Sequence, residues 1–483
     1  MASITSPGVG SGLDVSGIVT QLVALERAPL QKMQATATQI QTRISSYGKV
    51  QGMIAAVDDA ATTLGGSSLW GQTTATSGDA GSVGVTTTGS AAEGSYSVQV
   101  DQLAKAHGLA SSAFTDSSVE LGGGTLKFEF GTWDAGQTTF TANASATAVD
   151  VVIDPTASSL AEVRDQINAA NAGVTAVILR DASGARLLLR SSATGEESAL
   201  RISATDSLGD PLASGVGLGA LAFDPPNGGT AMTQTQAAQN ALVNVNGIDI
   251  VSTSNTLTEV LDGVNLTLTK ATTSAVEITV SVDKAAMRSA IDSFVKAYNE
   301  LNTFIAQQTR YDEASKVAGP LQGDSAAIRL RSQFRGLLGD SSTASTVFTR
   351  LTDIGFDVQK NGSIEIDATK LDAAFADLPE LTKLFAADDG DSLTNTGDGF
   401  GKRFEDLADD SIGFEGTVPS RTEGLQQRLS QNQDEQDRLE ERVALVQQRL
   451  LRQYTALDTQ MSRIKGLFNS VSAQMASLSN NGG

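Results

Sequence analysis

Three long stretches of this chain carry apolar residues at spacings of three and four, which is the pattern of a helix that packs along one face. The longest stretch runs from Leu425 to Leu478 and would form a rod of about 80 Å at roughly 1.5 Å per residue. An apolar stripe of that length is unfavourable in water, so we expect partner helices rather than a solvated terminal helix. Its predicted contact positions are Leu439, Val443, Val446, Leu450, Leu457, Ile464 and Phe468.

Polar residues interrupt this apolar stripe, which we call the seam of the helix. Asn432 and Gln436 stand where apolar residues are expected. The spacing also takes one irregular step near Leu450, which predicts a local change in winding. We therefore expect the helix to be marginally stable until it meets a partner, whose contacts must offset the entropy lost on ordering.

Two other stretches have the same spacing and are the predicted partners. The first follows Pro29, which is expected to interrupt a helix that starts near Ile18. The second begins at Lys284. The predicted contact positions are Leu30, Met33, Ile40, Ile44 and Ile54 in the first stretch and Met287, Ile291, Phe294 and Leu301 in the second.

Between these helices apolar and polar residues alternate, as they do in β-strands. Asn246-Gly247 is a typical hairpin turn. One helix, at 158–168, is expected to begin at a capping box formed by Ser159 and Glu162. The predicted strands are 126–130, 149–153, 174–179, 186–189, 240–250, 264–269 and 276–282.

The remaining segments are expected to be short elements and loops. Residues 209–229 are rich in Gly and Pro and are predicted to form a linker or surface loop. After the stretch that begins at Lys284 we expect two helical faces, with Pro379 starting a further helix. The predicted elements are a helix at 328–338, a hairpin at 351–366 that turns at Asn361-Gly362, a helical face at 371–385 and a loop at 388–401.

This order of elements predicts an α+β multidomain protein. Helices from both chain ends would form a coiled-coil-like bundle, and mainly-β domains would be inserted between them. The expected parts are terminal helices at 1–40 and 450–483, a helical bundle with a small β-hairpin at 41–71 and 284–449, an inner β domain at 72–113 and 234–283, and an outer β domain with one helix at 114–233.

Composition narrows the class of partner. The formal net charge is −21, which argues against nucleic acid or an anionic membrane as the main partner. No run of eighteen apolar residues is present, so no membrane span is expected. The chain has no cysteine, which excludes disulfides and thiolate metal sites. Met1 to Val15 contain no Lys or Arg and do not resemble a secretory signal.

Candidate catalytic and metal-binding residues are sparse. His107 is the only histidine, and a structural or surface role is favoured over a catalytic one. The loop that contains Asp388, Asp391 and Asp398 fails the EF-hand spacing, so a solvated loop is favoured over a calcium site. The paired aspartates at 58–59 and 409–410 have no recognisable acid–base framework. We therefore predict no enzyme activity, no catalytic residue, no cofactor and no metal.

Several motifs, taken in order, resemble the flagellar hook-associated protein 2 family, the filament cap proteins of bacterial flagella. Each motif is weak alone, but the ordered set is specific, and the resemblance extends over the whole chain. The motifs are Gly12 to Asp14 with Ile18 to Leu22 and Glu26 to Leu30, Gly94 to Ala104, Ser159 to Ala170 with Leu187 to Ser192, Asn255 to Val264, and Leu351 to Phe356 with Gly362 to Asp367.

The resemblance implies a structural cap at the distal filament tip, outside the cell, exported by the flagellar secretion apparatus without a cleaved signal peptide. It implies a ring-like homo-oligomer of about five subunits. The terminal helices would be legs that engage the filament end, while the β domains would cover a chamber in which flagellin folds and polymerises. Further implied partners are the hook–filament junction protein and an export chaperone that binds the C-terminal region.

Two other functions compete with this one. A surface adhesin would bind host glycans or mucin through the β domains, although Trp70 and Trp133 are far apart in sequence and form no evident sugar platform. A hook–filament junction protein would share the helical ends and β insertions. Glycan binding by the segment 72–283 would favour the first alternative, and localisation at the hook would favour the second.

Overall fold

The computed structural model describes residues 14–89, 91–314, 316–390 and 395–480, with side chains up to residue 476. Gly12 and Leu13 of the N-terminal motif, Asp391 of the acidic loop and the side chain of Leu478 therefore lie outside the described part. The chain forms two compact units, Met1–Trp70 with Lys284–Gly483, and Gly71–Asp283. Helices from both chain ends make the first unit and β-sheets make most of the second, which confirms the predicted α+β class.

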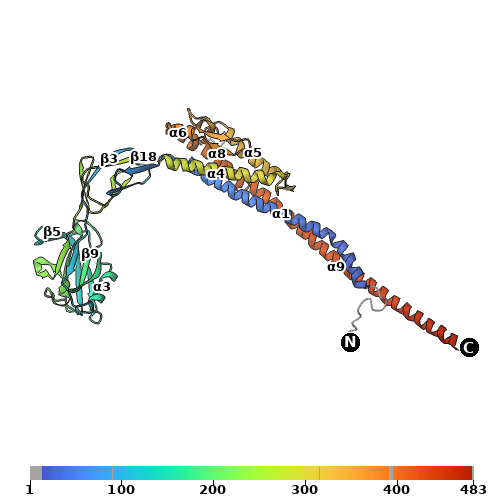
Figure 1. Cartoon of the computed structure of the whole chain (residues 1–483), viewed down its shortest axis with the longest axis horizontal. Helices are drawn as coiled ribbons and strands as arrows, with labels where there is room; N and C mark the ends of the chain where they lie inside the picture. The colour runs from blue at the N-terminus through green and yellow to red at the C-terminus, as the bar shows by residue number, and fades with distance from the viewer. Residues whose placement is uncertain (1–13, 90, 315, 391–394, 481–483) are drawn as a thin grey trace. The chain divides into compact units, whose positions relative to one another are not determined.

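The helical unit is built around two long helices. α1 spans Val15–Gly65 and α9 spans Thr417–Asn480, and the two lie side by side (Figure 1). α4, Lys284–Thr309, and α8, Phe400–Ile412, lie along the C-terminal half of α1. The shorter elements are α2 (Ser67–Trp70), α5 (Ser325–Gly339), α6 (Ala368–Ala374), α7 (Leu378–Ala386), the hairpin of β19 (Tyr311–Asp312) with β20 (Val317–Ala318), and that of β21 (Phe356–Val358) with β22 (Ile364–Ile366).

Pro29 does not interrupt the first helix, and that expectation was wrong. α1 is one helix of 51 residues with Pro29 inside it. Proline removes one backbone donor and crowds the preceding turn. Here Pro29 is exposed, so water can hydrate the carbonyl left without a donor, and packing on both sides keeps the remaining turns helical. The apolar seam consequently runs unbroken along α1.

α8 was not predicted, since the sequence was interpreted as loop up to residue 401. Its aromatic residues fill the centre of the bundle. The ring of Phe404 lies 4.9 Å from that of Phe294 and 6.4 Å from that of Phe334, centroid to centroid. Phe400 and Phe404 are both almost fully buried. The helix is therefore stabilised mainly by tertiary burial of aromatic side chains.

The second unit contains two cores. The first lies between a five-stranded sheet, ordered β1-β18-β3-β14-β15, and a three-stranded sheet, ordered β16-β17-β2, all antiparallel. Asn246 and Gly247 have φ of 51° and 85°, as the predicted two-residue hairpin turn requires. The strands are β1 (Thr73–Ser77), β2 (Val83–Thr87), β3 (Gly94–Gln102), β14 (Ala241–Val245), β15 (Ile248–Ser252), β16 (Thr256–Leu261), β17 (Val264–Leu268) and β18 (Val276–Val282).

The other core lies between a six-stranded sheet, a four-stranded sheet ordered β13-β4-β9-β8, and one helix, α3 (Leu160–Ala169). β4 and β13 pair in this sheet, although the sequence placed 108–111 in the inner domain. The strands are β4 (Gly108–Ser111), β5 (Gly124–Trp133), β6 (Phe140–Ala142), β7 (Val149–Ile153), β8 (Val174–Asp181), β9 (Gly184–Ser191), β10 (Ala199–Thr205), β11 (Phe223–Asp224), β12 (Gly229–Thr230) and β13 (Met232–Gln236).

Two local features explain how α3 is held. Ser159 and Glu162 form the predicted capping box. Asn168, near the end of α3, accepts a hydrogen bond from the backbone N–H of Ala176 at 2.8 Å and donates one to its carbonyl at 2.9 Å. The side-chain amide of Asn168 thus satisfies a backbone N–H and a backbone carbonyl of β8, which is an edge strand of its sheet.

Residues 209–229 do not form a linker, which corrects the sequence-based expectation. They contain a short 3-10 helix, Gly217–Leu221, and the small strands β11 and β12. Leu218 and Leu221 are fully buried in the outer core. The Gly-rich composition serves close approach of the backbone, since a Cβ on Gly219 would lie 2.1 Å from the carbonyl oxygen of Ala213.

Candidate assembly site on the terminal helices

α1 and α9 run antiparallel and share an apolar seam. Leu30 lies near Leu439 and Val443, whereas Ile40, further along α1, lies near Leu425, which is earlier in α9. The first turns of α1 contribute Val15 to the same seam. The core of this seam is formed by Val15, Val19, Val23, Leu439 and Val443, with Leu30, Met33, Leu450, Leu451 and Tyr454 packed against it.

The predicted contact residues fall into three groups by exposure. The fully or almost fully buried group is Ile54, Met287, Ile291, Phe294, Leu301, Leu439 and Val443. The half-buried group is Leu30, Met33, Ile40, Ile44, Val446 and Leu450. The exposed group is Leu457, Ile464 and Phe468. The first two groups pack within the bundle, so the exposed group is the part of the prediction that concerns contacts with another molecule.

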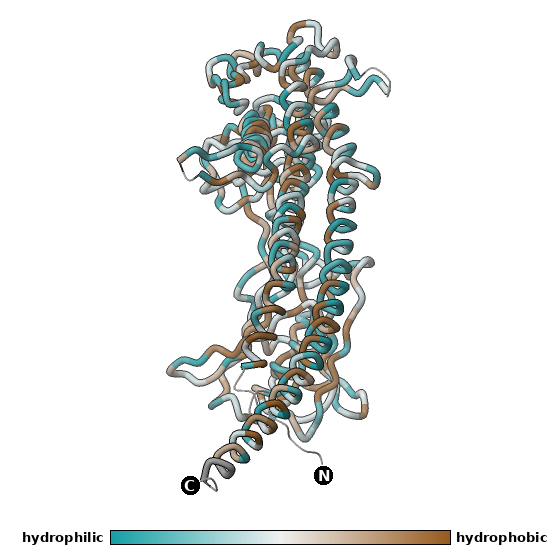
Figure 2. Tube along the Cα trace, turned by 90° about the vertical axis from the view of Figure 1, so that its right-hand side faces the viewer, coloured by the Kyte–Doolittle hydropathy of each residue, from teal (hydrophilic) through white to brown (hydrophobic). Residues whose placement is uncertain are grey.

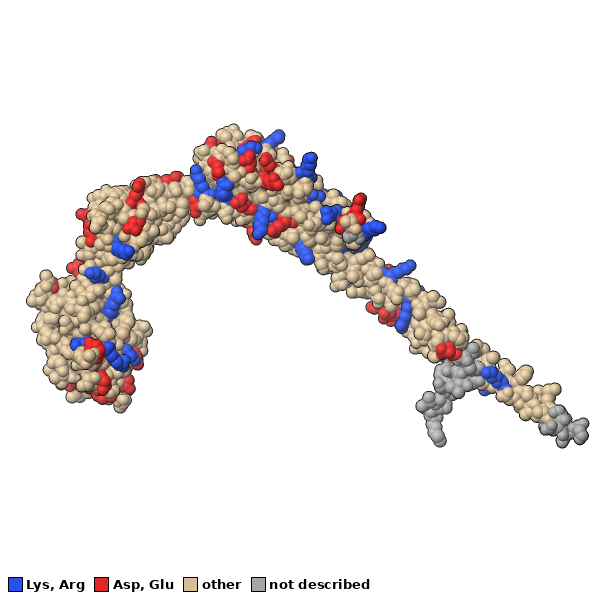
Figure 3. Space-filling model, in the orientation of Figure 1, with Lys and Arg blue, Asp and Glu red and all other residues tan. Residues whose placement is uncertain are grey.

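The exposed group lies where α9 extends past the described beginning of α1 (Figure 1). Leu457, Ile464 and Phe468 are 43%, 55% and 74% exposed. Figure 2 shows apolar residues recurring along this end of α9, and Figure 3 shows few charged side chains on its viewed face. We call this surface the terminal stripe; it comprises Leu457, Met461, Ile464, Leu467, Phe468, Val471 and Met475.

The other end of the seam is fixed by a buried carboxylate. Tyr47 on α1 donates a hydrogen bond to Asp324 at 2.7 Å, and Arg421 on α9 donates two more, at 3.1 and 2.7 Å. Asp324 also caps the first turn of α5. Burial opposes ionisation of Asp324, but the hydrogen bonds from Arg421 and Tyr47 prevail and lower the pKa of its carboxyl group. Sequence reasoning missed this group, since its members are far apart in the chain.

Polar residues loosen the middle of the seam. Gln436 donates a hydrogen bond to Asn432 at 2.5 Å, so the two polar seam residues satisfy each other. A depression of about 340 Å³ lies beside them, between Ile40 and Leu425. Polar and poorly filled seam positions reduce packing energy. The seam is therefore held tightly at Asp324 and at the apolar cluster around Leu439 and Val443, and more loosely between them, around Asn432 and Gln436.

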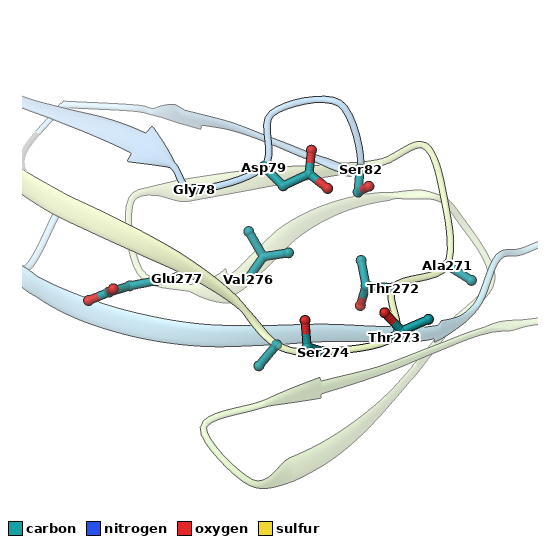
Figure 4. Close-up of a pocket in the computed structure, with 10 residues that line it drawn as sticks. Gly78, Asp79, Ser82, Ala271, Thr272, Thr273, Ser274, Val276 and Glu277 are labelled. Atoms are coloured by element: carbon teal, nitrogen blue, oxygen red, sulfur yellow. The ribbon is translucent and has the colours of Figure 1, made fainter.

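Elsewhere the described residues offer little for chemistry. A depression of about 420 Å³ in the inner β domain is lined by hydroxyl groups and two acids (Figure 4). Its polar groups serve the local fold, because Thr272 accepts a hydrogen bond from Val100 N–H and Asp79 accepts one from Gly81 N–H. No cluster of three metal-ligating side chains occurs in the described part of the chain. Within the same part, no helix is apolar over a length sufficient to cross a bilayer.

Neither tryptophan forms a sugar platform. Trp70 is buried in the helical unit, where it stacks on Phe385 at a centroid distance of 5.4 Å. Trp133 packs against Phe140 and Phe223 in the outer core, and its indole N–H donates to the carbonyl of Leu200 at 3.0 Å. The arrangement of these indoles therefore gives the adhesin alternative no support.

His107 is a buried structural residue, as the sequence favoured. Its Nδ1 accepts a hydrogen bond from the backbone N–H of Leu200 at 3.0 Å, so this nitrogen carries no proton. Burial lowers the pKa of His107 to about 4, and the neighbouring Gln234 offsets this only in part. The folded state thus binds this proton more weakly than the unfolded state.

We therefore expect the β unit to lose about 3 kcal/mol of stability as pH falls from about 6.5 to about 4, the window between the unfolded and folded pKa values of His107. Urea unfolding at pH 7 and pH 4.5, followed by the fluorescence of Trp133, measures this loss. The variant His107→Gln keeps an acceptor without the titration, so its stability should change less between the two pH values. An equal change in both proteins would contradict the assignment.

Comparison with known proteins gives a consistent result. The chain matches the models for the N-terminus and the C-terminus of flagellar hook-associated protein 2, over residues 11–107 and 238–466. It is 31% identical to the B-type flagellar hook-associated protein 2 of Pseudomonas aeruginosa, over 99% of this chain and 98% of that protein. It is 28% identical to flagellar hook-associated protein 2 of Escherichia coli K12, over 99% of this chain and 100% of that protein.

A solved structure supports the same relationship. The crystal structure of the D1-D2-D3 domains of the flagellar cap protein FliD from Escherichia coli matches with a TM-score of 0.62 at 26% sequence identity. The match covers 79% of this chain and 99% of that one. The similarity thus extends to the arrangement of helices and sheets as well as to the sequence.

Proposed function

Since the chain belongs to the flagellar hook-associated protein 2 family, we propose that it is the structural cap of a bacterial flagellar filament. It sits at the distal end of the filament, where it promotes the folding and polymerisation of exported flagellin and prevents its loss. The family resemblance seen in the sequence is confirmed, and it favours a filament cap over the hook–filament junction alternative. The family is structural, and we assign this chain no catalytic role, cofactor or metal.

The terminal stripe is the observation that carries this proposal. A cap must have a stably folded domain and must also bind the end of a growing polymer. α9 does both, because its first part is buried against α1 while its last part presents apolar residues to solvent. Such a surface is a binding surface for other helices, and helices with apolar stripes would bury it. We therefore assign the terminal stripe to the filament contact.

The proposed cap function also implies the partners of the chain and its location. The chain would act as a ring-like homo-oligomer outside the cell, after export by the flagellar secretion apparatus without cleavage of a signal. Its partners would be flagellin, the hook–filament junction protein and, before export, a chaperone at the C-terminal region. The absence of cysteine is compatible with export in an unfolded state.

Complementation tests the function directly. Expression of this chain in the parent bacterium lacking its own copy should restore filament growth and reduce flagellin lost to the medium. A fluorescent tag placed in the exposed turn at Asn246-Gly247 should label the distal filament end. A strain that stays without filaments although the chain is exported, or a label confined to the hook, would reject the proposal.

A further inference from the structure

An unpartnered carboxylate oxygen lies where α1 packs against α8. The backbones of the two helices approach closely where α1 ends and α8 begins, since a Cβ on Gly401 would lie 2.5 Å from the backbone nitrogen of Gly65. Asp58 precedes Gly65 by about two helical turns and therefore lies on the same face of α1. Its Oδ1 atom is buried and has no hydrogen-bond donor among the described residues. Such atoms are rare in folded proteins, because each costs the free energy of a lost hydrogen bond.

The charged side chains that face Asp58 add to this cost. Asp409 and Glu405 of α8 and the adjacent Asp59 of α1 are all acidic. Lys402 of α8 is a facing cation, but it is shared with Glu405, at 3.3 Å. Burial, followed by the charges of the three carboxylates, raises the pKa of Asp58, and Lys402 offsets this only in part. The charged form of Asp58 is therefore the less favourable form in this contact.

Apolar residues beside Asp58 connect this contact to the core of the helical unit. Val57 and Ala61 of α1 are fully buried, and so is Ala408 of α8. Phe404, one turn before Ala408, is the aromatic residue at the centre of the bundle. A change in the strength of the α1–α8 contact therefore affects the aromatic core.

We propose that Asp58 makes the contact between α1 and α8 sensitive to protons. With a proton bound, the carboxyl group is neutral, and neither its burial nor the facing carboxylates oppose the contact. Without the proton, a charged oxygen lies buried beside like charges, and the contact is weaker. Because α8 carries Phe404, the weaker contact lets the aromatic core open more often. The inference concerns the folding of the helical unit and is independent of the proposed function.

The direction of this pH dependence follows from the raised pKa. The stabilisation from Asp58 is complete below its ordinary pKa of 3.8 and is lost as pH rises through the folded pKa. Asp324 acts in the opposite direction, since its stabilisation is lost as pH falls through a lowered pKa. The lowered pKa of His107 likewise weakens the β unit in acid. Weak acid should therefore strengthen the α1–α8 contact while it destabilises the core around His107.

Hydrogen exchange of the α8 amides tests the inference on the full-length chain. Asp58→Asn keeps the shape of the side chain and removes its charge, so at pH 7 it should slow exchange in α8 about tenfold or more. After correction for the intrinsic effect of pH on amide exchange, acidification of the wild type from pH 7 to pH 5 should also slow exchange in α8. The corrected rate in Asp58→Asn should change by less than about twofold over the same range.

Asp292→Asn is the matched control, because it makes the same change at an exposed residue of α4. It should alter exchange in α8 by less than about twofold. The amides of α3, in the β unit, serve as the reference at each pH. Exchange in α8 that is unchanged or faster in Asp58→Asn, an equal slowing in Asp292→Asn, or a wild type without the pH dependence would overturn the inference. Exchange is measured on the purified chain, so such a result would leave the proposed cap function intact.

Discussion

Removal of residues 457–483 is expected to abolish capping and to leave both units folded. The described side chains in this segment are exposed or half-buried, so its loss should change the free energy of unfolding by less than about 0.5 kcal/mol. The terminal stripe, however, would be gone. The measurements are motility in soft agar and flagellin in the medium, alongside thermal unfolding of the purified chain.

A point variant distinguishes loss of the filament contact from loss of export of the chain. Phe468→Asp places a charge in the terminal stripe at a residue that is 74% exposed, and it should lower motility strongly. Ser470→Asp makes the same charge change two residues away, outside the stripe, and should have little effect. The amount of each variant outside the cell serves as the control for export. Full motility of the truncated chain or of Phe468→Asp would count against the stripe as the filament contact.

Asp324→Ala is expected to destabilise the helical unit by about 3–5 kcal/mol. The substitution leaves Arg421 and the buried hydroxyl of Tyr47 without their acceptor, and it removes the cap of α5. Urea unfolding followed by the fluorescence of Trp70 measures the loss, because Trp70 is buried in this unit. Asp372→Ala, which breaks an exposed pair with Arg288, should cost less than about 1 kcal/mol.

The carboxylate of Asp324 also makes the stability of the helical unit depend on pH. Because the folded pKa of Asp324 lies below its ordinary value of 3.8, the stabilisation is complete above that value and is lost as pH falls through the folded pKa. Asp324→Asn should therefore flatten the acid limb of the stability profile. An unchanged profile, or equal losses in Asp324→Ala and Asp372→Ala, would show that Asp324 does not anchor the seam.

The long seams could be predicted from the sequence because a helix repeats its contact positions locally. Spacing alone placed Met287 and Ile291 on a buried face, and the capping box at Ser159 and the turn at Asn246 were equally local. α8 could not be predicted, since its stability comes from contacts of Phe404 with residues distant in the chain.

The candidate site likewise has a part that could be predicted from the sequence and a part that could not. The residues of the terminal stripe could be identified as a helical face, but their exposure could not, because it depends on where α1 begins beside α9. The group around Asp324 joins three segments that share no local pattern, so only the folded structure brings them together. The interface role of the seam residues stays a prediction.

The antiparallel pairing of α1 with α9 also constrains the order in which the chain can fold. Residue 30 meets residue 439, so the bundle cannot close until nearly the whole chain is available. The β unit needs only residues 71–283 and can fold first. Once compact, it brings its two ends close together at the paired strands β1 and β18, which shortens the loop that the bundle must close. The inserted β unit thereby lowers the entropic cost of closing the bundle.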